Sequence, residues 1–166
     1  MNFDEATVIA LGGNLDLDGR PVQAVLDLAL THFQGEGLAL LRHSSWWRSK
    51  AWPDPTQPPF INGVALVRTE LDARGVLQAL MRIEAGLGRR RGEANAPRTL
   101  DLDLIAHGRD VIAESDLVLP HPRAAERRFV MGPLAEIAAQ WRHPVLGESA
   151  EALAARAAVG ADAAPV

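Results

Sequence analysis

The segment Arg98-Thr-Leu-Asp-Leu-Asp-Leu-Ile-Ala106 carries the clearest structural pattern in the chain, because leucine and aspartate alternate one by one. A period of two is typical of a half-buried strand, whose successive side chains point to opposite faces of a sheet. The leucines then share one face, and Asp101 and Asp103 share the other. The pattern predicts a strand over residues 98–106 that buries leucine on one side and presents two carboxylates on the other.

Upstream, short apolar runs alternate with helical patterns. The apolar runs predict strands at 6–11, 38–49 and 60–67, and helical spacing predicts helices at 21–33 and 72–87. Pro21 and Asp72 suit the starts of the two helices. The order strand, helix, strand, strand, helix, strand predicts an α/β (α+β) fold with a ferredoxin-like βαββαβ core, in which helices on one face cover a mostly antiparallel sheet.

The remaining stretches are expected to be loops and a short C-terminal helical region. Residues 50–59 contain four prolines and can be neither helix nor central strand, and residues 88–97 form a second polar loop. A short helix is expected at about 129–139. Residues 148–166 are rich in alanine and predict a peripheral helix that frays. No repeat is visible, so we expect a single domain over residues 1–166.

Composition excludes several classes of protein. The chain has 166 residues, a formal charge of −4, 48% hydrophobic and 23% charged residues, which suits a globular domain and not a disordered chain. No apolar run approaches the ~20 residues needed to span a bilayer, and the first 11 residues do not resemble a signal peptide. There is no cysteine for a disulfide, a thiolate metal site or a nucleophile. We expect a cytoplasmic protein.

Asp101 and Asp103 are candidate metal ligands. Their attachment points lie roughly 6.6 Å apart at ~3.3 Å per strand residue, so both carboxylates can converge on one ion or on a close pair of ions. The alternative is a solvated acidic strand face. However, like charges on one sheet face repel and aspartate disfavours strands, and a bound cation would reverse that penalty. Oxygen ligands without histidine favour Mg²⁺ shared with substrate phosphates.

Arginines lie on both sides of this strand in the sequence. Sixteen of the 17 cationic residues are arginine, and clusters occur at residues 89–91, at Arg98 and at residues 123–128. Each could be an ordinary surface charge, but together they suit clamps for a polyphosphate. No P-loop, dinucleotide-binding or protein-kinase signature is present. At pI ≈ 5.7 a general nucleic-acid coat is not expected.

A flat ligand is indicated by the third predicted strand, where Phe60 and Asn62 share a face. An asparagine amide offers both a donor and an acceptor to the polar edge of a heterocycle, and aromatic rings would stack on it. Phe129 follows the arginine-rich turn and could add a second ring. The alternative for Phe60 and Phe129 is core packing. Gly12-Gly13 indicates a turn where a ligand or backbone comes close.

Several of these motifs, in this order, resemble the 6-hydroxymethyl-7,8-dihydropterin pyrophosphokinase family of folate biosynthesis. The resemblance spans about residues 8–146. The matching pieces are Ala10-Leu-Gly-Gly-Asn-Leu15, Ser44-Ser-Trp-Trp-Arg48, Phe60-Ile-Asn62, Arg82-Ile-Glu84, Pro97-Arg-Thr-Leu-Asp-Leu-Asp-Leu-Ile105, and Leu119-Pro-His121 through Arg127 and Phe129. The Pro97–Ile105 block is the most specific of them.

The resemblance implies a monomer that transfers diphosphate from ATP to the hydroxymethyl group of the pterin, releases AMP, and has no nucleic-acid or membrane partner. It implies that Asp101 and Asp103 hold two Mg²⁺ ions. The positions associated with the pterin are Asn62, Phe60, Phe129 and Trp52. Those associated with ATP are Glu84, Arg89, Arg98, His121 and Arg127, and the expected catalytic set is Arg89, Arg98, Asp101 and Asp103.

Two other classes of function stay open on the sequence alone. One is a ferredoxin-like RNA-binding module, which would stack bases on exposed strand aromatics of a basic sheet. The other is a different metal-dependent enzyme, such as a nucleotidyl transferase or a phosphohydrolase that uses the same two carboxylates. The reaction products distinguish these classes.

Overall fold

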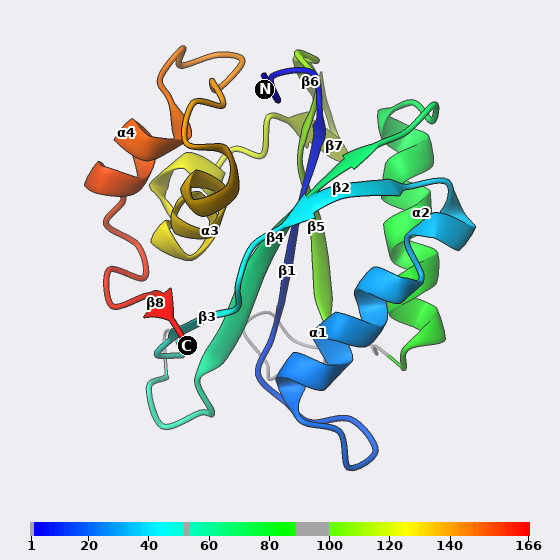
Figure 1. Ribbon diagram of the computed structural model, residues 1–166, viewed down its shortest axis with the longest axis vertical. Helices are drawn as coiled ribbons and strands as arrows, with labels where there is room; N and C mark the ends of the chain where they lie inside the picture. The colour runs from blue at the N-terminus through cyan, green and yellow to red at the C-terminus, as the bar shows by residue number, and fades with distance from the viewer. Residues whose placement is uncertain (1, 52–53, 89–99) are drawn as a thin grey trace.

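The computed structural model describes residues 2–51, 54–88 and 100–166, and a six-stranded sheet runs through its centre (Figure 1). The strands of this sheet are β1 (Thr7–Gly13), β2 (Ala39–His43), β3 (Trp47–Ser49), β4 (Phe60–Arg68), β5 (Asp101–His107) and β8 (Ala164–Pro165). The helices are α1 (Val22–Thr31), α2 (Ala73–Gly86), α3 (Arg128–Ala138) and α4 (Ala150–Arg156), with short 3₁₀ turns η1 (Gln34–Glu36) and η2 (Ala124–Glu126). A separate hairpin joins β6 (Ile112–Glu114) to β7 (Leu117–Leu119).

The sheet has the predicted ferredoxin-like topology. Its strand order is β5-β1-β4-β3-β8, β2 also pairs with β4, and the pairings between these strands are antiparallel. The single strand expected over 38–49 is divided into β2 and β3. At the division the Ser44 hydroxyl accepts the Val64 N–H (3.0 Å), so a side chain replaces a backbone acceptor in the ladder. β4 continues through Gly63, where a Cβ would lie 2.5 Å from the Trp46 ring.

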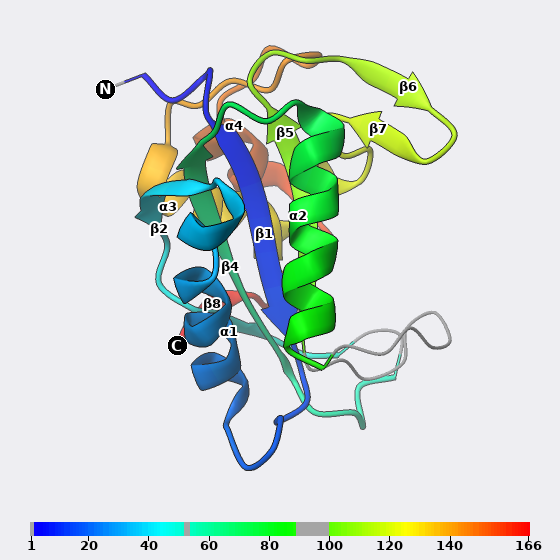
Figure 2. The same ribbon diagram turned by 90° about the vertical axis from the view of Figure 1, so that its right-hand side faces the viewer.

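Helices cover both faces of the sheet, whereas the sequence pattern predicted helices on one face. α1 and α2 lie on one side, and α3 and α4 lie on the other (Figures 1 and 2). The reason is that β1 and β4 are apolar at every position of their central parts, so each strand buries side chains in both directions. Two hydrophobic cores result, one on each face.

The first core lies between the sheet and the α1–α2 pair. Its strand residues include Ile9 and Leu11 from β1 and the leucines of the β5 segment, all nearly inaccessible to solvent. Asp72 caps α2, as predicted, because its carboxylate accepts the Gly75 N–H (2.8 Å). Pro21 was predicted to begin the first helix, and it directly precedes α1, which begins at Val22.

The second core lies between the sheet and α3–α4. α3 forms where a helix was expected and buries Val130, Met131 and Leu134 against the sheet. The alanine-rich region differs from the predicted fraying helix. Only residues 150–156 are helical, and α4 buries Leu153 in this core, because alanine side chains let it approach α3 closely.

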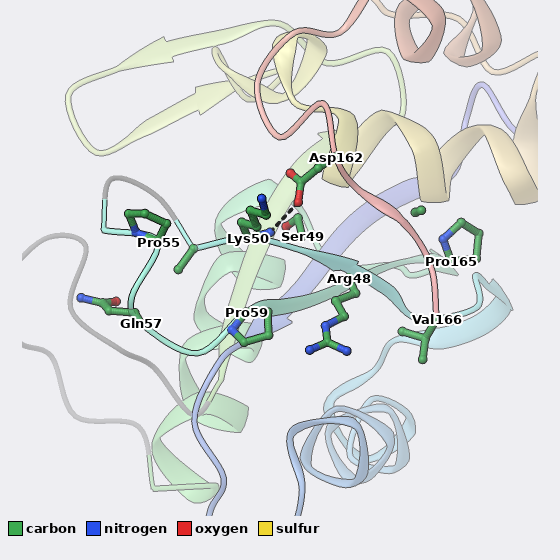
Figure 3. Close-up of a pocket in the computed structure, with 11 residues that line it drawn as sticks. Arg48, Ser49, Lys50, Pro55, Gln57, Pro59, Asp162, Pro165 and Val166 are labelled. Atoms are coloured by element: carbon green, nitrogen blue, oxygen red, sulfur yellow. Dashed lines mark hydrogen bonds between the residues drawn. The ribbon is translucent and has the colours of Figure 1, made fainter.

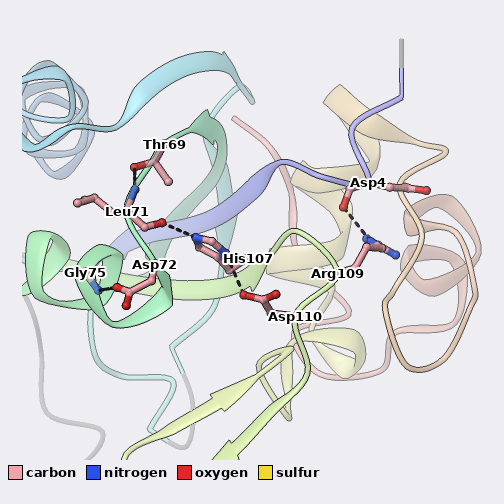
Figure 4. A network of polar contacts seen from close by, with 8 residues as sticks. All are labelled: Asp4, Thr69, Leu71, Asp72, Gly75, His107, Arg109 and Asp110. Atoms are coloured by element: carbon pink, nitrogen blue, oxygen red, sulfur yellow. Dashed lines mark hydrogen bonds and ion pairs between the residues drawn. The ribbon is translucent and has the colours of Figure 1, made fainter.

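A polar network fixes the far end of β5 to the start of α2 (Figure 4). The His107 Nε2–H donates to the Leu71 carbonyl (2.9 Å), and its Nδ1 lies 3.2 Å from the Asp110 carboxylate. Arg109 donates to the Asp4 carbonyl (2.9 Å) on the segment before β1. These contacts tie the end of β5 to the start of α2 and the following turn to the segment before β1. Within the described residues, no helix combines the length and apolar character needed to cross a membrane.

Candidate active site

The site begins as a row of residues that crosses three neighbouring strands. Gly12 of β1 pairs with Asn62 of β4 on one side and with Asp101 of β5 on the other. Ala10, two residues earlier, pairs with Asp103. Because side chains two residues apart share a face, the amide and both carboxylates project from the same side of the sheet, the side of α3. The predicted sharing of a face by Asp101 and Asp103 is thereby observed.

Gly12 allows the Asn62 side chain to lie close to the backbone of β1. A Cβ at this position would lie 2.3 Å from the Asn62 Oδ1, which is closer than any real Cβ contact. The sequence indicated a close approach here, and the group that approaches is the Asn62 side chain. Gly12 itself is part of β1, so the turn follows Gly13.

Two titratable groups, Arg127 and His121, lie on the segment that leads into α3 and interact electrostatically with the carboxylates. Burial lowers the pKa of the Arg127 guanidinium, while Asp103 and Asp101 oppose that effect by favouring its charge. Burial likewise lowers the pKa of His121, helped by Arg127 and Arg123, and Asp101 opposes it. The two carboxylates, Arg127 and His121 are all half-buried and influence one another electrostatically, which is typical of a polar site.

The protonation of His121 is set by its neighbours. Its Nδ1 accepts the Arg123 backbone N–H (3.2 Å), so the neutral ring carries its proton on Nε2. The His121 backbone N–H donates to the Ile105 carbonyl (2.8 Å), which ties the residue to β5. His121 therefore offers an Nε2–H donor beside the carboxylates, and its lowered pKa keeps the ring neutral at pH 7.

Aromatic groups stand at two further positions of the site. Phe129 lies in the first turn of α3, and the Arg127 guanidinium lies 5.6 Å from the centre of its ring. Phe60 lies two residues from Asn62 on β4 and therefore on the same face. Both rings are partly exposed and available to a flat ligand.

Glu84 has a structural contact that the sequence did not reveal. It lies in α2, is only 5% exposed, and its carboxylate accepts the Leu102 N–H (2.8 Å). Leu102 stands between the two aspartates on β5, so this charge-assisted bond fixes the backbone that carries them. The nucleotide contact expected for Glu84 stays a prediction.

The donor chemistry of the site fits a hard divalent cation. No group of three or more His, Cys, Asp or Glu side chains that could hold a metal occurs among the residues described here. Two carboxylates on one face, with cationic groups beside them, instead match the way Mg²⁺ is held by few protein oxygens together with phosphate oxygens. A cation at Asp101 and Asp103 would therefore share its coordination sphere with a ligand.

Not every predicted site residue can be placed. The structure brings Asp101, Asp103 and Asn62 onto one face, with His121 and Arg127 beside the carboxylates. Trp52, Arg89 and Arg98 lie outside the described residues. Arg123, to which the sequence assigned no role of its own, acts on both His121 and Arg127.

Comparison with known proteins identifies the family. The sequence profile of the family described as 7,8-dihydro-6-hydroxymethylpterin-pyrophosphokinase (HPPK) matches residues 8–139. A 2-amino-4-hydroxy-6-hydroxymethyldihydropteridine pyrophosphokinase of Synechocystis is 42% identical over 147 residues, which cover 86% of this chain and 71% of the relative. The Haemophilus influenzae protein of the same name is 38% identical over 134 residues, covering 78% of this chain and 79% of the relative.

Solved structures agree on the fold. The crystal structure of Plasmodium falciparum HPPK-DHPS with SDX-DHP superposes with a TM-score of 0.68 at 13% identity, covering 90% of this chain. The chain spans 43% of that Plasmodium chain.

A ferredoxin-like sheet with paired carboxylates and a nearby arginine suits a group-transfer enzyme acting on phosphates. The chain belongs to the 7,8-dihydro-6-hydroxymethylpterin-pyrophosphokinase family, whose members are diphosphotransferases.

Proposed function

We propose that the protein transfers the β,γ-diphosphate of ATP to the hydroxymethyl group of 6-hydroxymethyl-7,8-dihydropterin, with release of AMP, as a step of folate biosynthesis. The observation that carries the proposal is the row formed by Asn62, Gly12 and Asp101 across three adjacent strands. It sets a group suited to a heterocycle next to a group suited to a cation. Family membership supplies the substrate class.

The pterin occupies the Asn62 end of the row. The Asn62 amide pairs with the polar edge of the pterin ring, since it offers one acceptor and two donors. Phe129 stacks on the ring, Phe60 contacts it from β4, and Trp52 adds a further apolar contact. Stacking on aromatic side chains is worth about 1–3 kcal/mol for nucleobases, which are flat heterocycles of similar kind.

ATP occupies the end of the row near Asp101. Arg127, Arg89 and Arg98 neutralise phosphate charge, and His121 donates its Nε2–H to a phosphate oxygen. Glu84 acts on the nucleotide side and also holds the β5 backbone through Leu102. Arg127 keeps its charge despite its lowered pKa, because an arginine does not deprotonate near neutral pH.

Asp101 and Asp103 would hold two Mg²⁺ ions. When bound, the ions neutralise the phosphates and favour ionisation of the attacking hydroxyl. The two side chains suit this role because β5 is fixed at Leu102 by Glu84 and at its far end by His107.

The reaction is a displacement at the β-phosphorus. The pterin hydroxyl oxygen forms a bond to that phosphorus, the bond from the phosphorus to the α,β-bridging oxygen breaks, and AMP leaves with that oxygen. The hydroxyl proton is released. The contribution of the protein is to align the two substrates and to neutralise the migrating charge, which is how phosphoryl transfer is generally catalysed.

The deciding experiment is incubation of the protein with Mg-ATP, with and without 6-hydroxymethyl-7,8-dihydropterin, followed by product analysis. We expect AMP and a diphosphorylated pterin in equal amounts, and only when the pterin is present. Release of pyrophosphate or inorganic phosphate instead would indicate a nucleotidyl transferase or a phosphohydrolase and would overturn the proposal.

The structure favours an enzyme over the RNA-binding alternative. α3 packs on part of the sheet face that carries the aspartates, α4 packs on α3, and a hydrophobic core fills the space beneath them. An RNA-binding module of this topology presents an open sheet face to bases. The proposal also includes the expectations of a single domain over residues 1–166, a monomeric state and a cytoplasmic location.

A further inference from the structure

Residues 159–166, here called the buttress segment, run beside the chain that leads into α3. The Arg128 N–H donates to the Val159 carbonyl (2.9 Å), and the Val159 N–H donates to the Glu126 carbonyl (3.0 Å). These two bonds enclose Arg127, the cationic group beside the carboxylates. The buttress segment is therefore hydrogen-bonded to the backbone on both sides of a site residue.

The buttress segment also borders β3 and the chain that leaves it (Figure 3). β8 pairs with β3, and the Asp162 carboxylate accepts the Lys50 N–H (2.8 Å). A cavity of about 600 Å³ lies between the two stretches, and its lining includes Arg48, Pro59 and Val166. The segment thus holds the first residue of the proline-rich stretch 50–59 from the side opposite β4.

The buttress segment also packs against Phe129. Gly160 has a φ of +69°, and a Cβ on it would lie 2.6 Å from the Phe129 Cδ1 and 3.3 Å from its Cε1. Only glycine meets both conditions, because L side chains avoid this conformation and no atom fits in that space. The backbone at Gly160 therefore supports the edge of the Phe129 ring directly.

Arg128 connects the buttress segment to the same turn of α3. Its Nε donates to the carbonyl of Ala163 (3.1 Å), a buried residue, and its Nη1 donates to the Ala154 carbonyl (3.4 Å). Arg128 lies between Arg127 and Phe129 in the sequence. The hydrogen bonds of Arg128 therefore also help to fix the backbone of Arg127 and Phe129 relative to the buttress segment.

We infer that the buttress segment is a positioning element of the pterin site, which sets the ring of Phe129 and the start of the stretch after β3. This inference rests on the proposed function. The family profile matches residues 8–139, so the support comes from a part of this chain beyond the matched region. No residue of the segment is assigned contact with the substrate; the segment acts through Phe129 and Lys50.

The test compares two glycines with the same backbone conformation. Gly147 has a φ of +70° and nothing within 4 Å of its would-be Cβ, whereas Gly160 meets Phe129. Gly160→Ala is expected to raise the KM for the pterin, and the Kd from pterin fluorescence with a non-reactive ATP analogue, about tenfold, because small displacements of a positioning group are costly. The KM for ATP should change less than about twofold, and Gly147→Ala should match wild type in both.

A second variant guards against a folding defect in the first. Asp162→Asn keeps the shape but removes the charge that holds the Lys50 N–H, and it should raise the pterin Kd about threefold at an unchanged melting temperature. A pterin Kd equal to wild type in both Gly160→Ala and Asp162→Asn overturns the inference. Wild-type protein that releases no AMP with the pterin would refute the proposed function instead, so the two failures are distinguishable.

Discussion

The two faces of the sheet are built by the same strands, but they differ in the polarity of their side chains. On β5, Leu102 and Leu104 point into the first core and are 5% exposed, while Asp101 and Asp103 point to the opposite face and are half-buried. On β1, Ile9 and Leu11 are buried on the first face, while Gly12 leaves space for a polar side chain on the second.

The difference shows how the chain separates stability from chemistry. The face toward α1 and α2 is mostly apolar and supplies hydrophobic burial, with Thr7 as a buried polar residue of β1. The face toward α3 and α4 is apolar only where α3 and α4 pack on it, and the row at Gly12 is polar. A mutation on the first face should therefore change stability, and one in the polar row should change activity.

The largest effect is expected from the carboxylates. Asp101→Asn or Asp103→Asn should lower turnover at least about 10²-fold, as the loss of a transition-state-stabilising group does, with the melting temperature nearly unchanged. Asp116→Asn is the matched control, because that exposed aspartate lies in the β6–β7 turn and binds Arg74, away from the polar row. AMP release measures turnover. Near wild-type turnover in either site variant would contradict a metal-holding role.

A smaller and more selective effect is expected at the other end of the row. Asn62→Ala should weaken pterin binding about tenfold, the cost of losing buried hydrogen bonds, and leave the KM for ATP within about twofold. Gly12→Ala should act in the same direction, because its Cβ displaces the Asn62 amide. Separate titrations of the two substrates measure this. Equal losses for both would refute the assignment of Asn62 to the pterin.

The opposite pattern is expected on the first face. Ile9→Val removes one buried methyl group from a fully buried side chain and should lower the free energy of unfolding by about 1 kcal/mol. Its kcat and both KM values should match wild type. Urea unfolding and steady-state rates measure the two quantities. Lost activity at unchanged stability would mean that the two faces are not separable.

The smallest effect concerns pH. The pKa of His121 is lowered, first by burial and then by Arg127 and Arg123, so the unfolded chain binds more protons than the folded one below the ordinary value of 6.5. The free energy of unfolding should therefore fall as pH drops through 6.5 toward the lowered pKa. His143 contributes with the same sign, because burial also lowers its pKa. Urea unfolding between pH 7.5 and 5 should show a smaller pH dependence in His121→Gln than in wild type; an identical slope would contradict this.

The strands of the sheet were predictable because their patterns are local. Alternation located β5 and the face shared by Asp101 and Asp103, and the helical spacing after Asp72 located α2 with its cap. The spacing of Phe60 and Asn62 placed them on one face. Each of these conclusions depends on residues within a few positions of one another.

What the sequence could not supply depends on contacts between distant segments. The β6–β7 hairpin has three-residue strands and a Ser115-Asp116 turn, without the Asn-Gly or Asp-Gly signal of a tight hairpin. The covering of the second face depends on Gly132, where a Cβ would lie 2.6 Å from the Trp47 ring, and the sequence shows only a Gly-Pro pair inside an apolar helix. The contacts of Glu84 with Leu102 and of Gly160 with Phe129 join residues that no periodic pattern connects.

The bond between Glu84 and Leu102 has a consequence for self-association. β5 is an edge strand of the sheet. The outward N–H groups of an edge strand can pair with the backbone of another protein chain. At Leu102 that group is already taken by a carboxylate from the protein's own helix. A strand from another molecule could extend the sheet at Leu102 only by displacing the buried Glu84 carboxylate. The Glu84 contact therefore disfavours intermolecular strand pairing at this residue of β5.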